Sequence, residues 1–259
     1  MDRPSPPRPV WGVIGGMGPL ASAAFLTTIY EESAGVPEQQ LPSILLMSDP
    51  TIPDRTEAFL SGRESELAAD VTTRAQRLID AGATNIVMCC VTLHHLLPLL
   101  PPPIQKRVVS LVDVIVDHVA ATPGRHLLLC TEGTRRSRMF EDHERWKHAR
   151  DRIVLPNEAD QRAIHSLIYN IKRNRSSDQH LRLIARLTNR YAVESCIAGC
   201  TEIHIVAKKQ WRAAARSPLR WIDPLSIVAR QICGAVAPSS ISGPAAMNRH
   251  RLLPVASRG

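Results

Sequence analysis

Short apolar segments alternate with longer amphipathic segments along most of the chain. Four of the apolar segments are Val10–Ile14, Ser43–Met47, Asn85–Cys89 and Arg125–Cys130, and a fifth ends at Cys200. Each is short enough for a buried strand, and the segments between them, such as 19–32 and 64–81, have the spacing of helices. Strands that alternate with helices predict an α/β fold, with helices on both faces of parallel sheets.

The second half of the chain repeats features of the first half. Residues 16–22 resemble residues 131–137 with Gly18 and Gly133 in register, at an offset of 115 residues. Cys90 and Cys200, which are 110 residues apart, each close an apolar strand four residues before a histidine. We therefore expect two similar lobes related by pseudo-twofold symmetry. Since ligands bind beyond the carboxyl ends of parallel strands, we expect the site in the cleft between the lobes.

The expected boundaries follow from this repeat and from local composition. The first lobe takes residues 10–118, and we expect residues 220–237, a strand and a helix, to return to it. The second lobe takes residues 119–219. Residues 1–9 are proline-rich, and residues 238–259 begin with a run of proline, serine and glycine, so both are expected to be disordered tails.

Composition narrows the class of partner. Aromatic residues make up only 4% of the chain, which argues against a surface that stacks nucleic-acid bases. The formal charge of +8 comes from scattered basic residues that often lie beside acids, so we expect a small-molecule partner and no nucleic acid. Nothing reaches the ~18 apolar residues of a membrane helix, and the start is no signal peptide. We expect a cytoplasmic protein with reduced cysteines.

A glycine-rich turn follows the first strand. Gly16, Gly18 and Ala21 satisfy the spacing of a dinucleotide-binding fingerprint. Two features argue against that interpretation, because Pro19 removes an amide at the helix start and the acidic residue expected at the end of the second strand is misplaced. The remaining amides at this helix start suit a smaller anion such as a carboxylate.

The two cysteines that end strands are the main candidates for chemistry. Both precede helices, where amide dipoles lower the pKa of a thiol. Thiols that face each other across a cleft can remove a proton from one face of a carbon and return one to the other face, which is the chemistry of a cofactor-free racemase. Glu202 is close enough in sequence to tune Cys200, and His94 either orients its helix or contacts substrate.

A metal site is the alternative interpretation of the same segment. Cys89, Cys90, His94 and His95 are all metal-ligand types, but their spacing matches no zinc pattern, and the two histidines point different ways on a helix. We therefore expect no metal. Arg55, in the polar turn after the second strand, is placed to bind a carboxylate through its guanidinium fork.

Six motifs occur in order between residues 10 and 237. They are Gly15-Gly-Met-Gly-Pro-Leu20, Ile52-Pro-Asp-Arg-Thr56, Cys90-x-Thr92-x-His94, Thr131-x-Gly-Thr134, Ile168-Tyr169 and Ala198-Gly-Cys-Thr-Glu202. Together they resemble the aspartate/glutamate racemase superfamily, and its aspartate racemase branch most closely. The resemblance implies a two-lobed α/β fold, usually a homodimer, no pyridoxal phosphate or other cofactor, and a mechanism with two bases.

The resemblance also assigns site residues. Cys90 and Cys200 match the two catalytic thiols. Arg55 matches the residue that grips the side-chain carboxylate in aspartate racemases, and a basic residue that is either Lys172 or Arg173 shares this task. The residues that match the lining of the substrate pocket are Met17, Gly18, Thr92, Thr134 and Thr201.

One position departs from the family pattern. The family has an asparagine after the first catalytic cysteine, which holds the α-carboxylate or amino group of the substrate, and this chain has Val91. An isopropyl group forms no hydrogen bond, and a lost bond to a charged group is worth about 1.5–3 kcal/mol. The leading prediction is a racemase for aspartate, glutamate or a related acidic amino acid. The alternatives are an isomerase, epimerase or decarboxylase of the same superfamily that acts on another carboxylate, and a homologue that binds an amino acid without catalysis.

Overall fold

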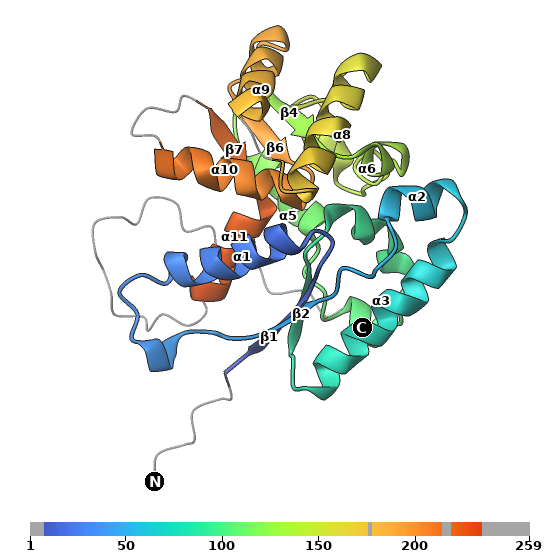
Figure 1. Ribbon diagram of the computed structural model, residues 1–259, viewed down its shortest axis with the longest axis vertical. Helices are drawn as coiled ribbons and strands as arrows, with labels where there is room; N and C mark the ends of the chain where they lie inside the picture. The colour runs from blue at the N-terminus through green and yellow to red at the C-terminus, as the bar shows by residue number, and fades with distance from the viewer. Residues whose placement is uncertain (1–7, 176–177, 214–218, 235–259) are drawn as a thin grey trace.

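Two parallel sheets form the centres of two lobes, and helices cover their faces (Figure 1). The computed structural model describes residues 8–175, 178–213 and 219–234, apart from the side chains of residues 212 and 213. The expected tails lie outside these residues, except for residues 8 and 9. The fold class predicted from the sequence is confirmed.

The two sheets have equivalent strand orders. The first sheet has the order β2-β1-β3, formed by Ser43–Ser48, Val10–Gly15 and Asn85–Met88. The second has the order β5-β4-β6-β7, formed by Ile153–Val154, His126–Leu129, Ser195–Ala198 and Arg220–Ile222. All strand pairs are parallel. Strands β1, β2 and β3 therefore occupy the places that β4, β5 and β6 occupy in the second sheet, as the internal repeat predicted.

Strand β7 corrects one expected boundary. The sequence analysis returned residues 220–237 to the first lobe, but β7 pairs with β6 in the second sheet. It takes the place that Val108 holds in the first sheet, where this residue bridges to Ile86. Helix α11, Pro224–Gly234, does pack against the first lobe, while residues 235–237 lie outside the described residues. The assignment of the strand was wrong because an apolar pattern reports burial and not the partner strand.

The helices follow the strands as the polar and apolar pattern indicated. The first half contains α1 Pro19–Glu32, α2 Arg55–Leu60, α3 Glu64–Asp80, α4 Pro102–Gln105, α5 Leu111–Ala121 and the short 3-10 helix η1 Glu38–Gln40. The second half contains α6 Glu132–Arg136, α7 Trp146–Ala149, α8 Glu158–Lys172, α9 Asp178–Arg190 and α10 Thr201–Ala213. Pro19 is the first residue of α1, where its missing N–H removes no helical bond.

The segment after Cys90 is helical, as expected, and it is wound as a 3-10 helix, η2 Val91–Leu99. Pro98 lies inside it and cannot donate the bond of an α-helix. The ring of His94 also approaches the carbonyl oxygens of Cys90 and Val91, at 3.1 and 3.2 Å, and competes with backbone amides for them. The missing amide of Pro98 and the contacts of the His94 ring both favour the tighter winding of a 3-10 helix.

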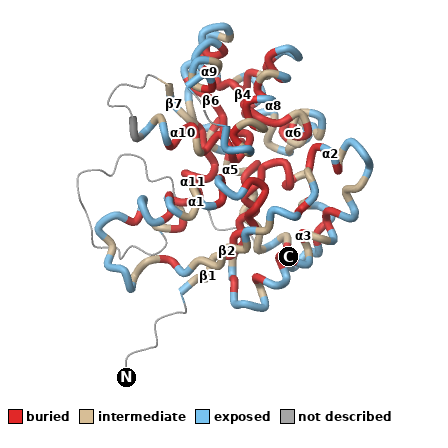
Figure 2. Tube along the Cα trace, viewed as in Figure 1, coloured by how far each residue is buried: buried red, intermediate tan, exposed pale blue. Residues whose placement is uncertain are grey.

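A shared apolar core fixes the lobes relative to each other. Helix α11 packs against α1 and α5, and α5 contacts α7 and β7 of the second lobe. The largest cluster of buried apolar side chains accordingly draws on both sheets, with Val13 and Val87 from the first and Leu128 and Ile197 from the second. Exposed residues lie on the outward sides of helices such as α2 and α9 (Figure 2).

Candidate active site

Cys90 and Cys200 lie just beyond β3 and β6, the equivalent strands of the two sheets. Their relative exposures are nearly equal, 4% and 3%. Cys89 belongs to the shared core, whereas Cys90 belongs to the cluster on the other face of its sheet, because successive side chains of an extended strand point to opposite faces. Burial and Glu202 raise the pKa of Cys200, and Lys172 acts to lower it.

Glu202 connects one candidate thiol to the opposite lobe. It lies in the first turn of α10 and is 1% exposed. Its Oε2 accepts a hydrogen bond of 2.8 Å from Sγ of Cys200, and its Oε1 accepts one of 3.0 Å from the amide of Gly18. The carboxylate therefore contacts the second-lobe thiol and the glycine turn of the first lobe at the same time.

The two glycines that the repeat pairs are both points of close approach between the lobes. A Cβ at Gly18 would lie 2.9 Å from Oε1 of Glu202. A Cβ at Gly133 would lie 2.6 Å from Oγ1 and 3.0 Å from Cα of Thr56. A side chain larger than hydrogen at either position would compete with a residue of the other lobe for the same space.

Threonine hydroxyls form a second contact across the cleft. Oγ1 of Thr92 lies 2.8 Å from that of Thr134 and 3.3 Å from that of Thr131, which also caps the start of α6. Thr201 is placed differently, because its hydroxyl donates a bond of 3.2 Å to the carbonyl oxygen of Cys89. Among the expected pocket residues, Thr92 and Thr134 meet each other, and Thr201 joins the second lobe to the backbone of the first.

Arg55 is buried at the start of α2, with a relative exposure of 6%. Its Nη2 donates to the carbonyl oxygen of Met17 at 2.9 Å, and its Nη1 donates to that of Pro53 at 2.9 Å. Its Nε is buried and has no hydrogen-bond partner among the described residues. One N–H of the guanidinium is therefore free for an acceptor that is not part of the chain.

The surroundings of Arg55 carry negative charge. Burial acts to lower the pKa of Arg55, but the charges of Cys90, Asp54 and Glu202 outweigh it and raise the pKa. The guanidinium thus remains charged beside the first-lobe thiol.

Lys172 is the cation of α8 that lies between the lobes, whereas Arg173, the alternative from the sequence, is exposed. Its Nζ lies 3.9 Å from Oδ2 of Asp54 and 4.4 Å from the centre of the Tyr169 ring. The hydroxyl of Tyr169 donates a bond of 2.7 Å to the same carboxylate oxygen. Burial acts to raise the pKa of Asp54. Other interactions lower this pKa below its usual value, and the hydrogen bond from Tyr169 has the largest effect among them.

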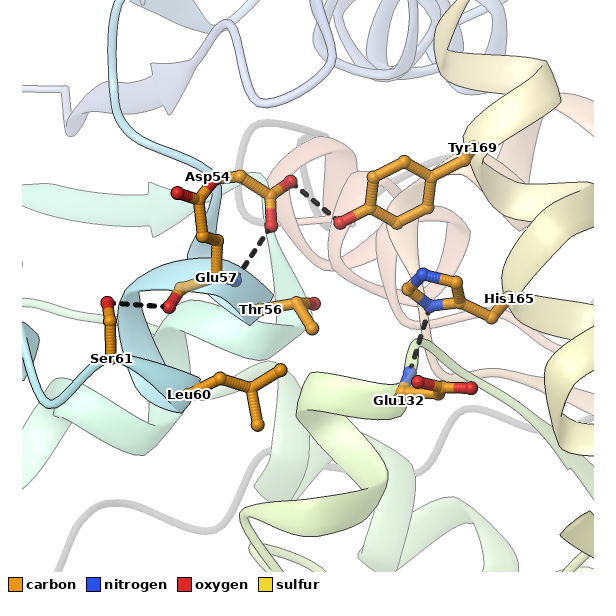
Figure 3. Close-up of a pocket in the computed structure, with 8 residues that line it drawn as sticks. All are labelled: Asp54, Thr56, Glu57, Leu60, Ser61, Glu132, His165 and Tyr169. Carbon is orange, nitrogen blue, oxygen red and sulfur yellow. Dashed lines mark hydrogen bonds between the residues drawn. The ribbon is translucent and has the colours of Figure 1, made fainter.

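A pocket of about 490 Å³ opens beside this bridge (Figure 3). It is lined by Asp54, Thr56, Glu57, Leu60, Ser61, Glu132, His165 and Tyr169. Asp54 and Tyr169 point toward each other, and the amide of Glu132 donates to Nδ1 of His165 at 3.2 Å (Figure 3). Three of the lining side chains are carboxylates, so the pocket is acidic.

His94 orients its helix and the next one. The amide of Leu111, the first residue of α5, donates to Nε2 of His94 at 3.0 Å. Because Nε2 of His94 accepts this bond, the ring proton is on Nδ1, which lies 3.1 Å from the carbonyl oxygen of Cys90. Burial lowers the pKa of His94, and the ring is accordingly neutral.

The electrostatics of Cys200 differ from the expectation. The amides at the helix start were expected to lower the pKa of this thiol, but burial and Glu202 raise it well above its usual value. Lys172 offsets this only in part. The expectation was wrong because burial and a carboxylate in direct contact outweigh the partial charge of a helix end.

Three residues of the cleft had no assigned role in the sequence analysis: Tyr169, Glu132 and His165. The helical spacing in the sequence could have indicated two of them. His165, Tyr169 and Lys172 are spaced by four and then three residues along α8, so they share one face of the helix. Nothing in the local sequence marks Glu132, whose contact with His165 forms only in the folded protein.

Within residues 8–175, 178–213 and 219–234, no three side chains of His, Cys, Asp or Glu gather closely enough to hold a metal ion. All six cysteines are free thiols. In the same part of the chain, no helix is long and apolar enough to cross a membrane.

Comparison with known proteins places this cleft in a sequence family. The family model described as Asp/Glu/Hydantoin racemase matches residues 14–232. An aspartate racemase from Picrophilus torridus is similar in structure, with a TM-score of 0.72, 22% identity, and coverage of 88% of this chain and 94% of its own. A putative Asp/Glu racemase from Yersinia pestis has a TM-score of 0.65, 21% identity, and coverage of 88% and 99%. The aspartate racemase homologue PH1733 from Pyrococcus horikoshii OT3 has a TM-score of 0.57, 20% identity, and coverage of 89% and 99%.

Proposed function

Because the chain belongs to the Asp/Glu/Hydantoin racemase family, we propose that it interconverts the L and D forms of aspartate, glutamate or a related acidic amino acid, with Cys90 and Cys200 as the two bases. The observation that carries the proposal is the placement of these two buried thiols just beyond equivalent strands of the two sheets. Free thiols in this arrangement suit removal and return of a proton on opposite faces of one carbon.

The remaining residues of the cleft have tasks that follow from their contacts. The free Nε–H of Arg55 suits a substrate carboxylate, and the threonine hydroxyls of Thr92 and Thr134 can donate to charge that develops on it. One cysteine, as thiolate, removes the α-proton and forms an S–H bond. The other, as thiol, delivers its proton to the opposite face and becomes the thiolate. Proton count and charge are thus conserved in each turnover.

Proton NMR of the reduced protein in D₂O tests the proposal. With L- and D-aspartate and L- and D-glutamate, and without added cofactor, we expect loss of the Cα–H signal and formation of the other enantiomer. Cys90→Ala and Cys200→Ala should each abolish inversion. Cys233→Ala, which removes a half-buried thiol on α11 outside the cleft, is the control and should retain it. No exchange with any acidic amino acid in the folded, reduced protein would contradict the proposal.

A second candidate is racemisation of a related carbon acid, such as a hydantoin. Two observations favour it. Val91 is fully buried in the shared core and offers no hydrogen bond at the position of the family asparagine. The pocket beside the cleft is lined by the carboxylates of Asp54, Glu57 and Glu132, which repel a second substrate carboxylate. Exchange with 5-substituted hydantoins above the protein-free rate, and none with acidic amino acids, would select this candidate.

A further inference from the structure

The two thiols have different neighbours although the repeat places them equivalently. The residue two positions after Cys90 is Thr92, and the residue two positions after Cys200 is Glu202. Both side chains reach across the cleft to the opposite lobe, Thr92 to Thr134 and Glu202 to Gly18. The repeat therefore pairs a neutral hydroxyl in one lobe with a carboxylate in the other.

The bond between Cys200 and Glu202 requires a proton on the sulfur. Sγ donates to Oε2 at 2.8 Å, and an ionised carboxylate has no proton to give in return. The amide of Gly18 holds the other oxygen of Glu202, so the carboxylate cannot turn away without breaking a contact between the lobes. Ionisation of Cys200 would place two negative charges within hydrogen-bond distance in a buried site.

Charged groups from both lobes surround the two thiols, with Arg55 and Asp54 in the first lobe and Lys172 and Glu202 in the second. Burial acts to lower the pKa of Arg55, and negative charge on Cys90 is the largest contribution that raises it. Bonds from the guanidinium to the carbonyl oxygens of Met17 and Pro53 hold it in this place. The first lobe therefore presents a fixed positive charge, whereas the sulfur of Cys200 contacts a carboxylate.

We propose that Cys200 is the thiol that carries the catalytic proton in the resting protein, and that Glu202 is the positioning residue that keeps the proton there. The catalytic meaning of the inference rests on the proposed two-thiol function. In the resting form, Cys90 takes the α-proton of the substrate and forms an S–H bond, while Cys200 gives its proton to the opposite face. Cys200 is then a thiolate beside Glu202, and the resting form returns when a proton moves from Cys90 to Cys200 through solvent or through the reverse reaction.

The pH dependence of alkylation by iodoacetamide tests this placement of the proton, with each site quantified by mass spectrometry of its peptide. Both thiols are buried, with relative exposures of 4% and 3%, so each site is compared by the pH of half-labelling and not by its labelling rate. A Cys89→Ala background removes the adjacent thiol from the Cys90 peptide. We expect Cys200 to reach half-labelling at a higher pH than Cys90, because the carboxylate of Glu202 opposes ionisation of the Cys200 sulfur.

Glu202→Gln isolates the role of the carboxylate. The amide keeps the size of the side chain and can still accept from Gly18, but it removes the negative charge beside Cys200. We expect the half-labelling pH of Cys200 to fall by about one unit or more, and that of Cys90 to change less. Glu194→Gln is the control, because it removes an exposed carboxylate just before β6 and should leave both thiols unchanged.

An equal half-labelling pH for the two thiols, or a lower one for Cys200, in protein with wild-type Glu202 overturns the inference. So does a Glu202→Gln protein with native circular dichroism and unchanged labelling of Cys200. If Glu202→Gln does not fold, the comparison of labelling at Cys90 and Cys200 in protein with wild-type Glu202 tests the inference by itself. The assay contains no substrate, so the two hypotheses fail separately: racemisation with equal labelling rejects only the asymmetry, and unequal labelling without racemisation rejects only the proposed function.

Discussion

Tyr169 donates a hydrogen bond of 2.7 Å to Oδ2 of Asp54, and this bond joins the two lobes at the residue before Arg55. Asp54 is also the N-cap of α2, since its Oδ1 accepts a bond of 3.1 Å from the amide of Glu57. Lys172, one turn after Tyr169 on α8, lies 3.9 Å from the same carboxylate. The bridge therefore joins the start of the helix that carries Arg55 to α8 of the second lobe.

Tyr169→Phe removes this bond and keeps the ring under Lys172. We expect KM to rise about twofold to tenfold with a smaller change in kcat, as for loss of a bond worth roughly 0.5–1.5 kcal/mol. Steady-state racemisation kinetics measure both constants. Tyr191→Phe is the matched control, because its hydroxyl donates to Asp160 within the second lobe and its loss should leave KM unchanged. An unchanged KM in Tyr169→Phe would show that the bridge does not contribute to binding.

Gly133→Ala places a methyl group where Thr56 of the other lobe lies. Alanine favours a helix by about 1 kcal/mol over glycine, so α6 by itself should gain stability. We nevertheless expect kcat/KM to fall about tenfold or more, since a conflict worth about 1.4 kcal/mol in the closed form has this effect. Gly234→Ala is the control, because among the described residues no atom outside its own helix and chain neighbours lies within 4 Å of its Cβ position. Wild-type kinetics for Gly133→Ala would mean that the lobes do not approach this closely during catalysis.

Asp223 and His204 form a buried pair behind the site. Oδ2 of Asp223 lies 2.6 Å from Nδ1 of His204 and accepts a bond of 2.8 Å from Ser226. Burial acts to raise the pKa of Asp223, but His204 and Ser226 bring it below its usual value. Asp223→Asn should lower the free energy of unfolding at pH 7 by about 3–5 kcal/mol, because it leaves a buried partner uncompensated.

The pH dependence of this loss has a definite sign. A carboxyl group whose pKa is lower in the folded state stabilises the protein fully above its unfolded pKa of about 3.9. The stabilisation is lost as the pH falls through the folded value. Urea unfolding at several pH values should therefore show the gap between wild type and Asp223→Asn narrowing below about pH 4. Ser226→Ala, which removes one hydrogen bond, should cost only about 1 kcal/mol; a constant gap from pH 7 to pH 3 would contradict the assignment.

Val91→Asn restores the amide of the family pattern. We expect kcat/KM for aspartate or glutamate to rise about tenfold or more, if a bond to a charged group worth about 1.5–3 kcal/mol is regained. The free energy of unfolding should fall by about 1–3 kcal/mol, because position 91 is fully buried in the shared core. Val91→Ala should lower stability without raising the rate. An unchanged rate with Val91→Asn would show that this position does not contact the substrate.

The sequence by itself determined the elements, the repeat and the family. Strands and helices were predictable because their apolar spacing is local, and the α/β class followed from their order. Gly18 aligns with Gly133, and Cys90 aligns with Cys200, because equivalent positions of the two lobes lie where the lobes approach each other.

Only the tertiary structure decided how these residues meet. Glu202 and Gly18 are 184 residues apart, and Tyr169 and Asp54 are 115 apart, so no local pattern could pair them. The same holds for β7, whose apolar residues indicate burial in a sheet without indicating which sheet. The raised pKa of Cys200 depends on burial and on the place of a carboxylate, and both are properties of the folded chain.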